Sequence, residues 1–236
     1  MTILADAFTW LNDPANWTGP DGVIALTGEH LAMSALAVLL AAALALPLGT
    51  WLGHRRRGGT FTTIAANTSR ALPTFALLLI FATTAIGFGN RPTVLAAAIF
   101  AIPPILISTY AGLMDVDADA RDAARGMGMS GLRALATVEI PLALPMIAAG
   151  VRTAVLQVIA TVPLAALVGG GGLGTIIIRG FANRRFGEVL AGGVLVAVLC
   201  LVAEAALAAG QHLLTPAPMR VHAARTRHRR AQPAVS

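Results

Sequence analysis

A charged segment between two apolar stretches carries the residues with the clearest chemical potential. From Asp115 to Pro141 it places acidic side chains first and arginines after them, an order that favours a helix because the helix N-terminus attracts anions. Gly126 and Gly128 then interrupt the pattern, and glycine tolerates the backbone angles of a sharp turn. A structured loop of this length is usually functional. We therefore expect two short helices that a soluble partner can contact.

Two ionisable residues lie inside long apolar stretches, where such groups are functional or paired. They are Arg152 and Glu204. Counting about 1.5 Å per residue from the ends of the stretches gives both a similar depth, which predicts an ion pair. If the helix that carries Arg152 begins only at Pro145, Arg152 lies nearer the lipid headgroups instead.

A run of glycines at residues 169–174 invites comparison with phosphate-binding loops. No lysine follows it, because all 17 basic residues of the chain are arginines, and a P-loop needs its lysine. The arginine bias is also what a GC-rich genome produces. We interpret the run as an external re-entrant loop in which Gly171, Gly172 and Gly174 line a gate.

Other catalytic chemistry finds no support in the sequence. The single cysteine, Cys200, lies in an apolar run, and no His/Cys spacing fits a metal site. Glu29 and His30 could hold a proton or a metal ion, but interfacial polarity at a helix start explains them better. We expect no catalytic residue, no metal and no cofactor in this chain.

Composition identifies an integral membrane protein. The 236 residues are 56% hydrophobic and only 12% charged, against about 25% charged residues in soluble domains. A bilayer core needs roughly 20 apolar helical residues, and five stretches qualify. They are Leu31–Gly53, Ala71–Gly89, Thr93–Met114, Ile140–Leu167 and Val189–Leu214. Prolines within them require a packed bundle that satisfies the freed carbonyls.

The arginines set the orientation, because cytoplasmic loops are enriched in basic residues. With the N-terminus outside, eleven arginines are cytoplasmic: Arg55, Arg56, Arg57, Arg121, Arg125, Arg133, Arg220, Arg225, Arg227, Arg229 and Arg230. Four are external: Arg91, Arg179, Arg184 and Arg185. The net charge of +6 therefore reflects topology, and we expect no nucleic acid partner.

The sequence thus predicts an all-α polytopic membrane protein with five transmembrane helices, N-terminus outside and C-terminus inside. We expect an external segment at 1–28, a transmembrane domain at 29–214 with the charged loop at 115–140, and a basic tail at 215–236. Residues 1–12 form either an interfacial helix with aromatic anchors or a loop. The tail is expected to be disordered, serving topology and solubility or touching anionic lipid.

The charged loop resembles the Glu-Ala-Ala loop of permeases from binding-protein-dependent ABC importers. The resemblance begins with Asp122-Ala123-Ala124 and continues through Gly128 to Val138-Glu139-Ile140-Pro141. Asp122 stands where the family usually has Glu, and Ile140 where Leu is commoner. Ordered matches over nearly the whole chain point to the osmoprotectant branch, which imports glycine betaine, choline, carnitine or proline. They are Glu29-His30-Leu31, Pro47-Leu48-Gly49, residues 72–77, 109–113, 123–129, 140–145 and 149–154, and Gly169–Gly174.

The resemblance implies a type I ABC importer permease core in a bacterial cytoplasmic membrane. Two such permeases, identical or homologous, pair, each offers its loop to one subunit of an ATPase dimer, and an external solute-binding protein delivers the substrate. ATP and Mg belong to the ATPase. In this loop Ala123 and Ala124 keep the docking face thin, Asp122 offers polar contacts, and Pro141 starts the next span. Gly126 and Gly128 allow the turn between its two short helices.

Three alternatives remain open at this stage. Another small solute, such as an amino acid, fits the same permease. A stand-alone secondary transporter would need a coupling-ion site at mid-membrane, for which only Arg152 and Glu204 are available. A membrane-embedded enzyme would need a nucleophile–base set or a metal cluster, and the sequence offers neither.

Overall fold

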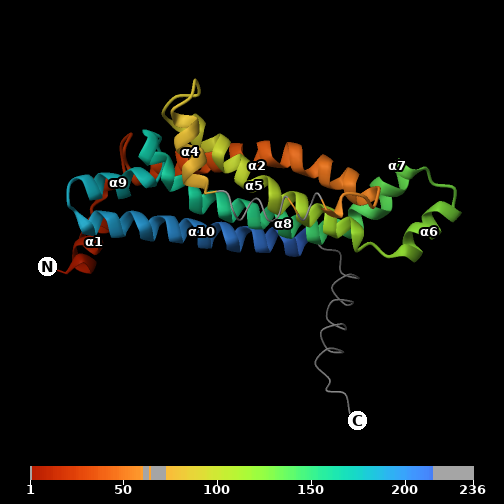
Figure 1. The fold of residues 1–236 in the computed structure, drawn as a ribbon. Coiled ribbons are helices and arrows are strands. Elements are labelled where there is room, and N and C mark those ends of the chain that lie inside the picture. The colour runs from red at the N-terminus through yellow and green to blue at the C-terminus, as the bar shows by residue number, and fades with distance from the viewer. Residues whose placement is uncertain (1, 61–63, 65–72, 215–236) are drawn as a thin grey trace, which may run out of the picture.

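The computed structural model describes residues 2–60, 64 and 73–214, and this part of the chain is helical without any strand (Figure 1). The outer and connecting elements are α1 (Ile3–Asn12), η1 (Pro14–Asn16), α4 (Thr74–Ala82), α6 (Ala118–Gly126), α7 (Gly131–Ala134) and α9 (Gly174–Ala182). The long helices are α2 (Val23–His54), α5 (Asn90–Met114), α8 (Ile140–Thr161) and α10 (Phe186–Leu214). A π-helical turn, η2 (Leu135–Glu139), precedes α8, and a 3₁₀ helix, η3 (Val162–Val168), follows it.

Four helical segments of the described chain are long and apolar enough to cross a membrane. They are Val23–His54, Asn90–Met114, Gly131–Val168 and Phe186–Gln211. The predicted second span, Ala71–Gly89, begins outside the described residues, and its described part contains α4. The predicted spans were too short at two starts: α2 begins at Val23 rather than Leu31, and the helical run into α8 begins at Gly131 rather than Ile140.

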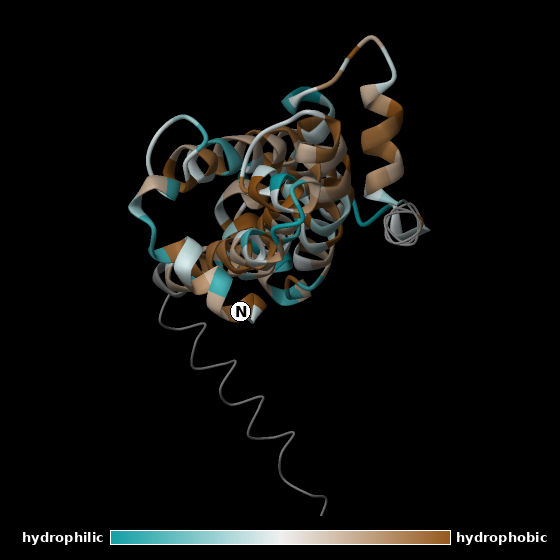
Figure 2. Cartoon of the chain, turned by 90° about the vertical axis from the view of Figure 1, so that its left-hand side faces the viewer, coloured by the Kyte–Doolittle hydropathy of each residue, from teal (hydrophilic) through white to brown (hydrophobic). Residues whose placement is uncertain are grey.

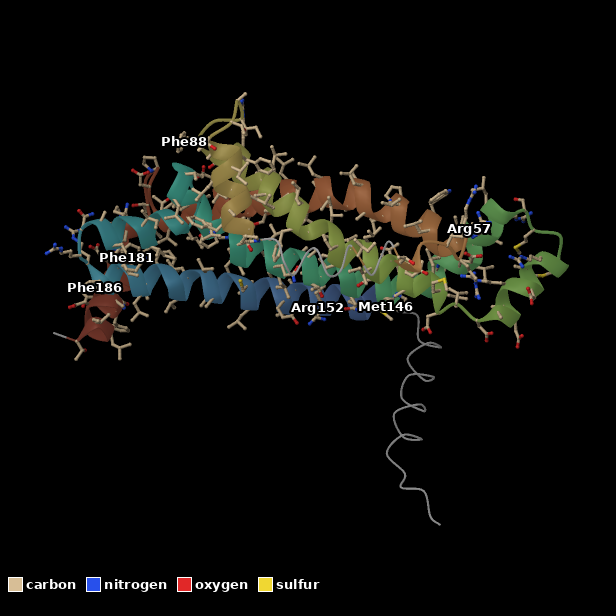
Figure 3. The ribbon with its side chains drawn as sticks, viewed as in Figure 1. Arg57, Phe88, Met146, Arg152, Phe181 and Phe186 are labelled. Carbon is tan, nitrogen blue, oxygen red and sulfur yellow. The ribbon has the colours of Figure 1, made fainter. Side chains whose placement is uncertain are left out.

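The long helices run side by side, and the short elements gather at the two ends of the bundle (Figure 1). Helices α6 and α7 lie at one end, whereas α1 and α9 lie at the other. Arg57 is at the α6 end, and Phe181 and Phe186 are at the α9 end (Figure 3). This separation agrees with the arginine pattern, because Arg55, Arg56 and Arg57 follow the end of α2 that approaches α7.

Small residues at every fourth position let α2 pack closely on α5. These buried residues of α2 are Ala37, Ala41, Ala45, Gly49 and Gly53. A Cβ added at Gly49 would lie 2.9 Å from the Thr109 Cβ of α5. The close approach matters in lipid because dispersion contacts and interhelical hydrogen bonds, rather than a hydrophobic driving force, hold helices together. Leucines 36, 40, 44 and 48 occupy the neighbouring, exposed stripe.

Glycines also set the contact between α5 and α8. A Cβ at Gly150 would overlap the Ser108 side chain and approach the Pro104 carbonyl oxygen to 2.9 Å. A Cβ at Gly112 would lie 2.9 Å from the Met146 Cβ. The two helices therefore touch near both Gly112 and Gly150, with their chains running in opposite directions.

Helix α1 packs across the start of α10. Gly187 makes this possible, since a Cβ there would lie 2.6 Å from the Asp6 Cβ. The side chains of Ile3, Leu4 and Phe8 remain exposed on the other face of α1. The sequence left a helix and a loop open for residues 1–12, and the structure shows a helix there. Figure 2 looks at the bundle from this end, and α4 stands at its side as a uniformly apolar helix.

An ion pair joins α8 to α10 within the span. Arg152 Nε donates to Glu204 Oε2 at 2.8 Å, a second guanidinium nitrogen donates to Oε1, and Nη1 donates to Gln211 Oε1 at 3.3 Å. Gln211 in turn donates to the Pro145 carbonyl, 3.2 Å away, which adds a further contact between α10 and α8. The structure thus brings together the two intramembrane ionisable residues, with α8 beginning before Pro145.

A double-mutant cycle measures the worth of this pair. Arg152→Met and Glu204→Gln should each lower the thermal midpoint of the purified complex, because each leaves a partly buried polar group without its partner. The double variant should lose less unfolding free energy than the sum of the two single losses, by about 0.5–3 kcal/mol. Thr153→Val combined with Glu204→Gln is the matched control and should be additive. Additive losses for the Arg152 pair itself would contradict the contact.

Candidate functional site

Helix α6 is built from local capping and charge order. The Asp117 side chain accepts a hydrogen bond from the Asp119 backbone N–H at 3.0 Å, which caps the helix start. Asp119 lies in the first turn and Arg125 in the last, so both charges suit the helix dipole. Asp122 and Arg125 form an exposed ion pair with 3.6 Å between the charged atoms, which contributes little to stability.

A tight turn separates α6 from α7. Gly128 has a φ of +76°, a conformation that costs L residues energy and glycine none. Its N–H donates to the Arg125 carbonyl at 2.8 Å, and the Met129 N–H donates to the Ala124 carbonyl at 3.1 Å. Ser130 then caps α7 by accepting from the Arg133 N–H at 3.4 Å. Gly126 ends α6 in helical geometry, so the turn itself depends on Gly128.

The two alanines of the loop face opposite ways. Ala123 is exposed beside Asp122, whereas Ala124 is buried against the bundle. Met127 and Leu132 are large and exposed nearby. The outward face of this loop therefore offers a short carboxylate, a methyl group and two large apolar side chains, while Ala124 serves the inner contact.

A buried polar cluster ties α6 to the ends of the long helices. Arg121 is 5% exposed and Glu139 is 3% exposed. A terminal guanidinium nitrogen of Arg121 donates to the Leu113 carbonyl at the end of α5 and lies 3.8 Å from Glu139 Oε2. The same Glu139 oxygen accepts from His54 Nδ1 at 2.8 Å, at the end of α2. One guanidinium and one carboxylate thus connect α6 with α2, α5 and η2.

Burial lowers the pKa of Arg121, the nearby Glu139 carboxylate raises it, and Arg56 and Arg125 lower it slightly. A guanidinium nevertheless stays charged at neutral pH. Arg121 Nε is buried without a hydrogen-bond partner among the described atoms. A buried charge of this kind depends on its partners, because removing one of a buried pair costs about 3–5 kcal/mol.

A second polar cluster holds the glycine loop at the opposite end. Glu29 Oε1 accepts from the Asn90 side-chain amide at 2.6 Å, and Oε2 accepts from the Gly172 N–H at 3.1 Å. Asn90 Oδ1 accepts from the Gly171 N–H at 2.8 Å. A Cβ at Gly171 would overlap the Glu29 carboxylate, and one at Gly174 would overlap the Pro163 carbonyl. The loop is therefore clamped between the starts of α2 and α5.

Two further polar contacts lie near this end. His30 is fully buried and donates from Nε2 to the Ile159 carbonyl at 3.0 Å. Glu188 is buried at the start of α10 and accepts from Arg179 Nε at 2.6 Å. Across the residues that the structure describes, no group of three or more His, Cys, Asp or Glu side chains could hold a metal ion. The His30 hydrogen bond joins α2 to α8.

The predicted site residues fall into three places. Asp122, Ala123, Ala124, Gly126 and Gly128 lie together at the α6 end, with Pro141 exposed in the first turn of α8. Arg152 and Glu204 meet within the bundle. Gly171, Gly172 and Gly174 lie at the α9 end.

Sequence reasoning missed Arg121, Glu139, Asn90 and the clamping role of Glu29. The sequence does carry a signal for Arg121, because it lies three positions before Ala124, which places both on one face of α6. The pairing of Glu139 with His54 crosses 85 positions and had none.

The comparisons with known proteins agree with this architecture. Residues 45–212 match the family model described as the binding-protein-dependent transport system inner membrane component. The glycine betaine/carnitine/choline transport system permease protein OpuCB of Bacillus subtilis is 35% identical, over 80% of this chain and 87% of that protein. The osmoprotectant import permease protein OsmW of Salmonella typhimurium is 34% identical, over 83% of this chain and 93% of that protein.

A solved structure gives the same fold. An inward-facing MetNI methionine ABC transporter superposes with a TM-score of 0.70 at 21% identity, covering 80% of this chain and 94% of that one. The family match, the relatives and the fold all lead to one conclusion. The chain is a multi-pass membrane protein that belongs to the family of binding-protein-dependent transport system inner membrane components.

Proposed function

We propose that this chain forms half of the translocation pathway of an ATP-driven importer for compatible solutes, namely quaternary ammonium compounds or proline. A dimer of ATPase subunits binds and hydrolyses ATP with Mg, and this permease, itself no enzyme, converts their closure into alternating access. A second permease completes the pathway, and an extracytoplasmic binding protein delivers the solute. The assembly belongs in a bacterial cytoplasmic membrane.

The observation that carries this proposal is the attachment of α6. Its outward face exposes Asp122 and Ala123, and its inward face is fastened by Arg121 to α5 and, through Glu139, to α2 and η2. Energetic coupling travels through packed side chains and ionic networks of this kind. A push on the exposed face therefore moves three helix ends together, as a coupling helix must.

The substrate class follows from the relatives. Their names specify glycine betaine, carnitine, choline or osmoprotectants in general. Uptake of labelled glycine betaine, choline, carnitine and proline into vesicles tests this class, with the chain reconstituted beside its ATPase and binding protein. Import should require ATP and both partners. Import by the chain alone would overturn the proposal in favour of a secondary transporter.

The buried cluster predicts a loss of coupling that exceeds the loss of stability. Arg121→Met and Glu139→Gln should each reduce the solute imported per ATP hydrolysed, because α6 is then held by fewer contacts. In the double variant Arg121→Met, Glu139→Gln, the loss of unfolding free energy should differ from the sum of the two single losses by about 0.5–3 kcal/mol. Arg133→Met, an exposed charge at the same end, is the matched control. Unchanged transport per ATP in both single variants would remove the cluster from the mechanism.

The turn after α6 predicts a different defect. Gly128→Val places a β-branched residue at a φ of +76°, a strain of about 1–3 kcal/mol, although no atom crowds a Cβ there. Membrane insertion should be normal while solute-stimulated ATPase activity is lost, because α6 is presented at a wrong angle. Gly126→Ala, which has open space and ordinary backbone angles, should keep that activity. Normal stimulation in Gly128→Val would contradict the role of this turn.

A further inference from the structure

An apolar slot opens between α2 and α5 at the end that carries the glycine loop. It has a volume of about 580 Å³, within the range of about 300–1,000 Å³ typical of small-molecule sites. Its walls are formed by Met33, Leu36 and Leu40 of α2 and by Val94 and Leu95 of α5. Glu29, Asn90 and Arg91 are the polar residues that line it.

The Glu29 carboxylate has hydrogen bonds but no counter-charge. Its two oxygens accept from the Asn90 amide at 2.6 Å and the Gly172 N–H at 3.1 Å, both of which are neutral donors. Among the described ion pairs, which extend to 4.0 Å, none includes Glu29. A partly buried carboxylate beside apolar walls attracts a cation, and each oxygen of this one already accepts a hydrogen bond.

Arg91 supplies the opposite charge to the same slot. It is exposed, and no described carboxylate lies within ion-pair distance of it. A guanidinium binds a carboxylate through two parallel hydrogen bonds. The slot therefore combines one uncompensated anion, one uncompensated cation and walls of methyl and methylene groups, with no net charge.

We propose that this slot binds a small zwitterion made of a quaternary ammonium group and a carboxylate. Methylated nitrogen donates no hydrogen bond, so it suits a carboxylate whose oxygens already have neutral donors, and its methyl groups suit Met33, Leu36 and Val94. The solute carboxylate binds Arg91. This inference rests on the proposed function and adds to it a solute site within the permease, next to the loop held by Glu29.

Equilibrium binding of ¹⁴C-labelled glycine betaine and choline distinguishes the two charged contacts, because choline has no carboxylate. The sample is the purified permease–ATPase complex in phosphatidylglycerol nanodiscs without binding protein. Arg91→Gln should weaken glycine betaine binding about tenfold or more, the worth of a hydrogen bond between charged groups, and leave choline binding unchanged. Glu29→Gln should weaken the binding of both solutes. Arg184→Gln, at an exposed arginine between α9 and α10, is the matched control and should change the binding of neither solute.

Two more variants separate solute binding from the clamp and from lipid. Gly174→Ala displaces the glycine loop, because its Cβ would overlap the Pro163 carbonyl, but it leaves every residue that lines the slot unchanged, so binding should persist. Leu36→Trp should fill the slot and abolish binding of both solutes. If Gly174→Ala abolishes binding as Glu29→Gln does, the carboxylate acts through the loop and the proposal is overturned. If Leu36→Trp leaves solute binding intact, the slot holds something else, such as an acyl chain.

The proposed function is tested independently in the same preparation. Wild-type complex that imports no compatible solute with its binding protein and ATP would contradict the proposed function. If the wild-type complex imports glycine betaine but binds it without saturation, only the slot assignment is contradicted. The same holds if Arg91→Gln weakens the binding of glycine betaine and of choline equally.

Discussion

The buried guanidinium of Arg121 is the contact on which the α6 end depends. Helix α6 is short and carries few apolar residues, so packing alone cannot hold it to the bundle. Its position comes from one charged side chain that reaches the Leu113 carbonyl and Glu139, and Glu139 is itself held by His54. Losing any one partner leaves a buried polar group unsatisfied. The exposed face of α6 is therefore held in place because detaching its inner side would leave buried polar groups unsatisfied.

The same constraint recurs through the membrane-spanning part of the chain. Lipid offers no hydrogen bonds, so each polar group must find a partner inside the protein. Arg152 meets Glu204 and Gln211, and Gln211 also donates to the Pro145 carbonyl of α8. Glu29 and Asn90 satisfy two backbone N–H groups of the glycine loop. Each polar contact thereby joins segments far apart in sequence, and the helices between them need only small residues to pack closely.

Much of this could be read from sequence because it depends on local properties. Apolar length predicts the spans, and acids before arginines predict the helix α6. The Arg152–Glu204 pair followed from depth along two helices. The starts of α2 and of the helical run that leads into α8 escaped prediction, because polar and charged residues continue those helices beyond the apolar stretch. The clusters around Glu139 and Glu29 escaped it too, since a single sequence carries no signal for which distant side chain satisfies a buried carboxylate.

Two helices connect the ends of the molecule. Helix α2 carries Glu29 at one end and His54 at the other, about 37 Å apart along a helix of 1.5 Å rise per residue. Helix α5 carries Asn90 and Leu113 in the same arrangement. The close glycine and alanine contacts between these helices prevent one from sliding on the other without loss of packing. In the proposed coupling, a displacement that begins at α6 would reach the glycine loop through these two packed helices, whose ends are marked by the two polar clusters.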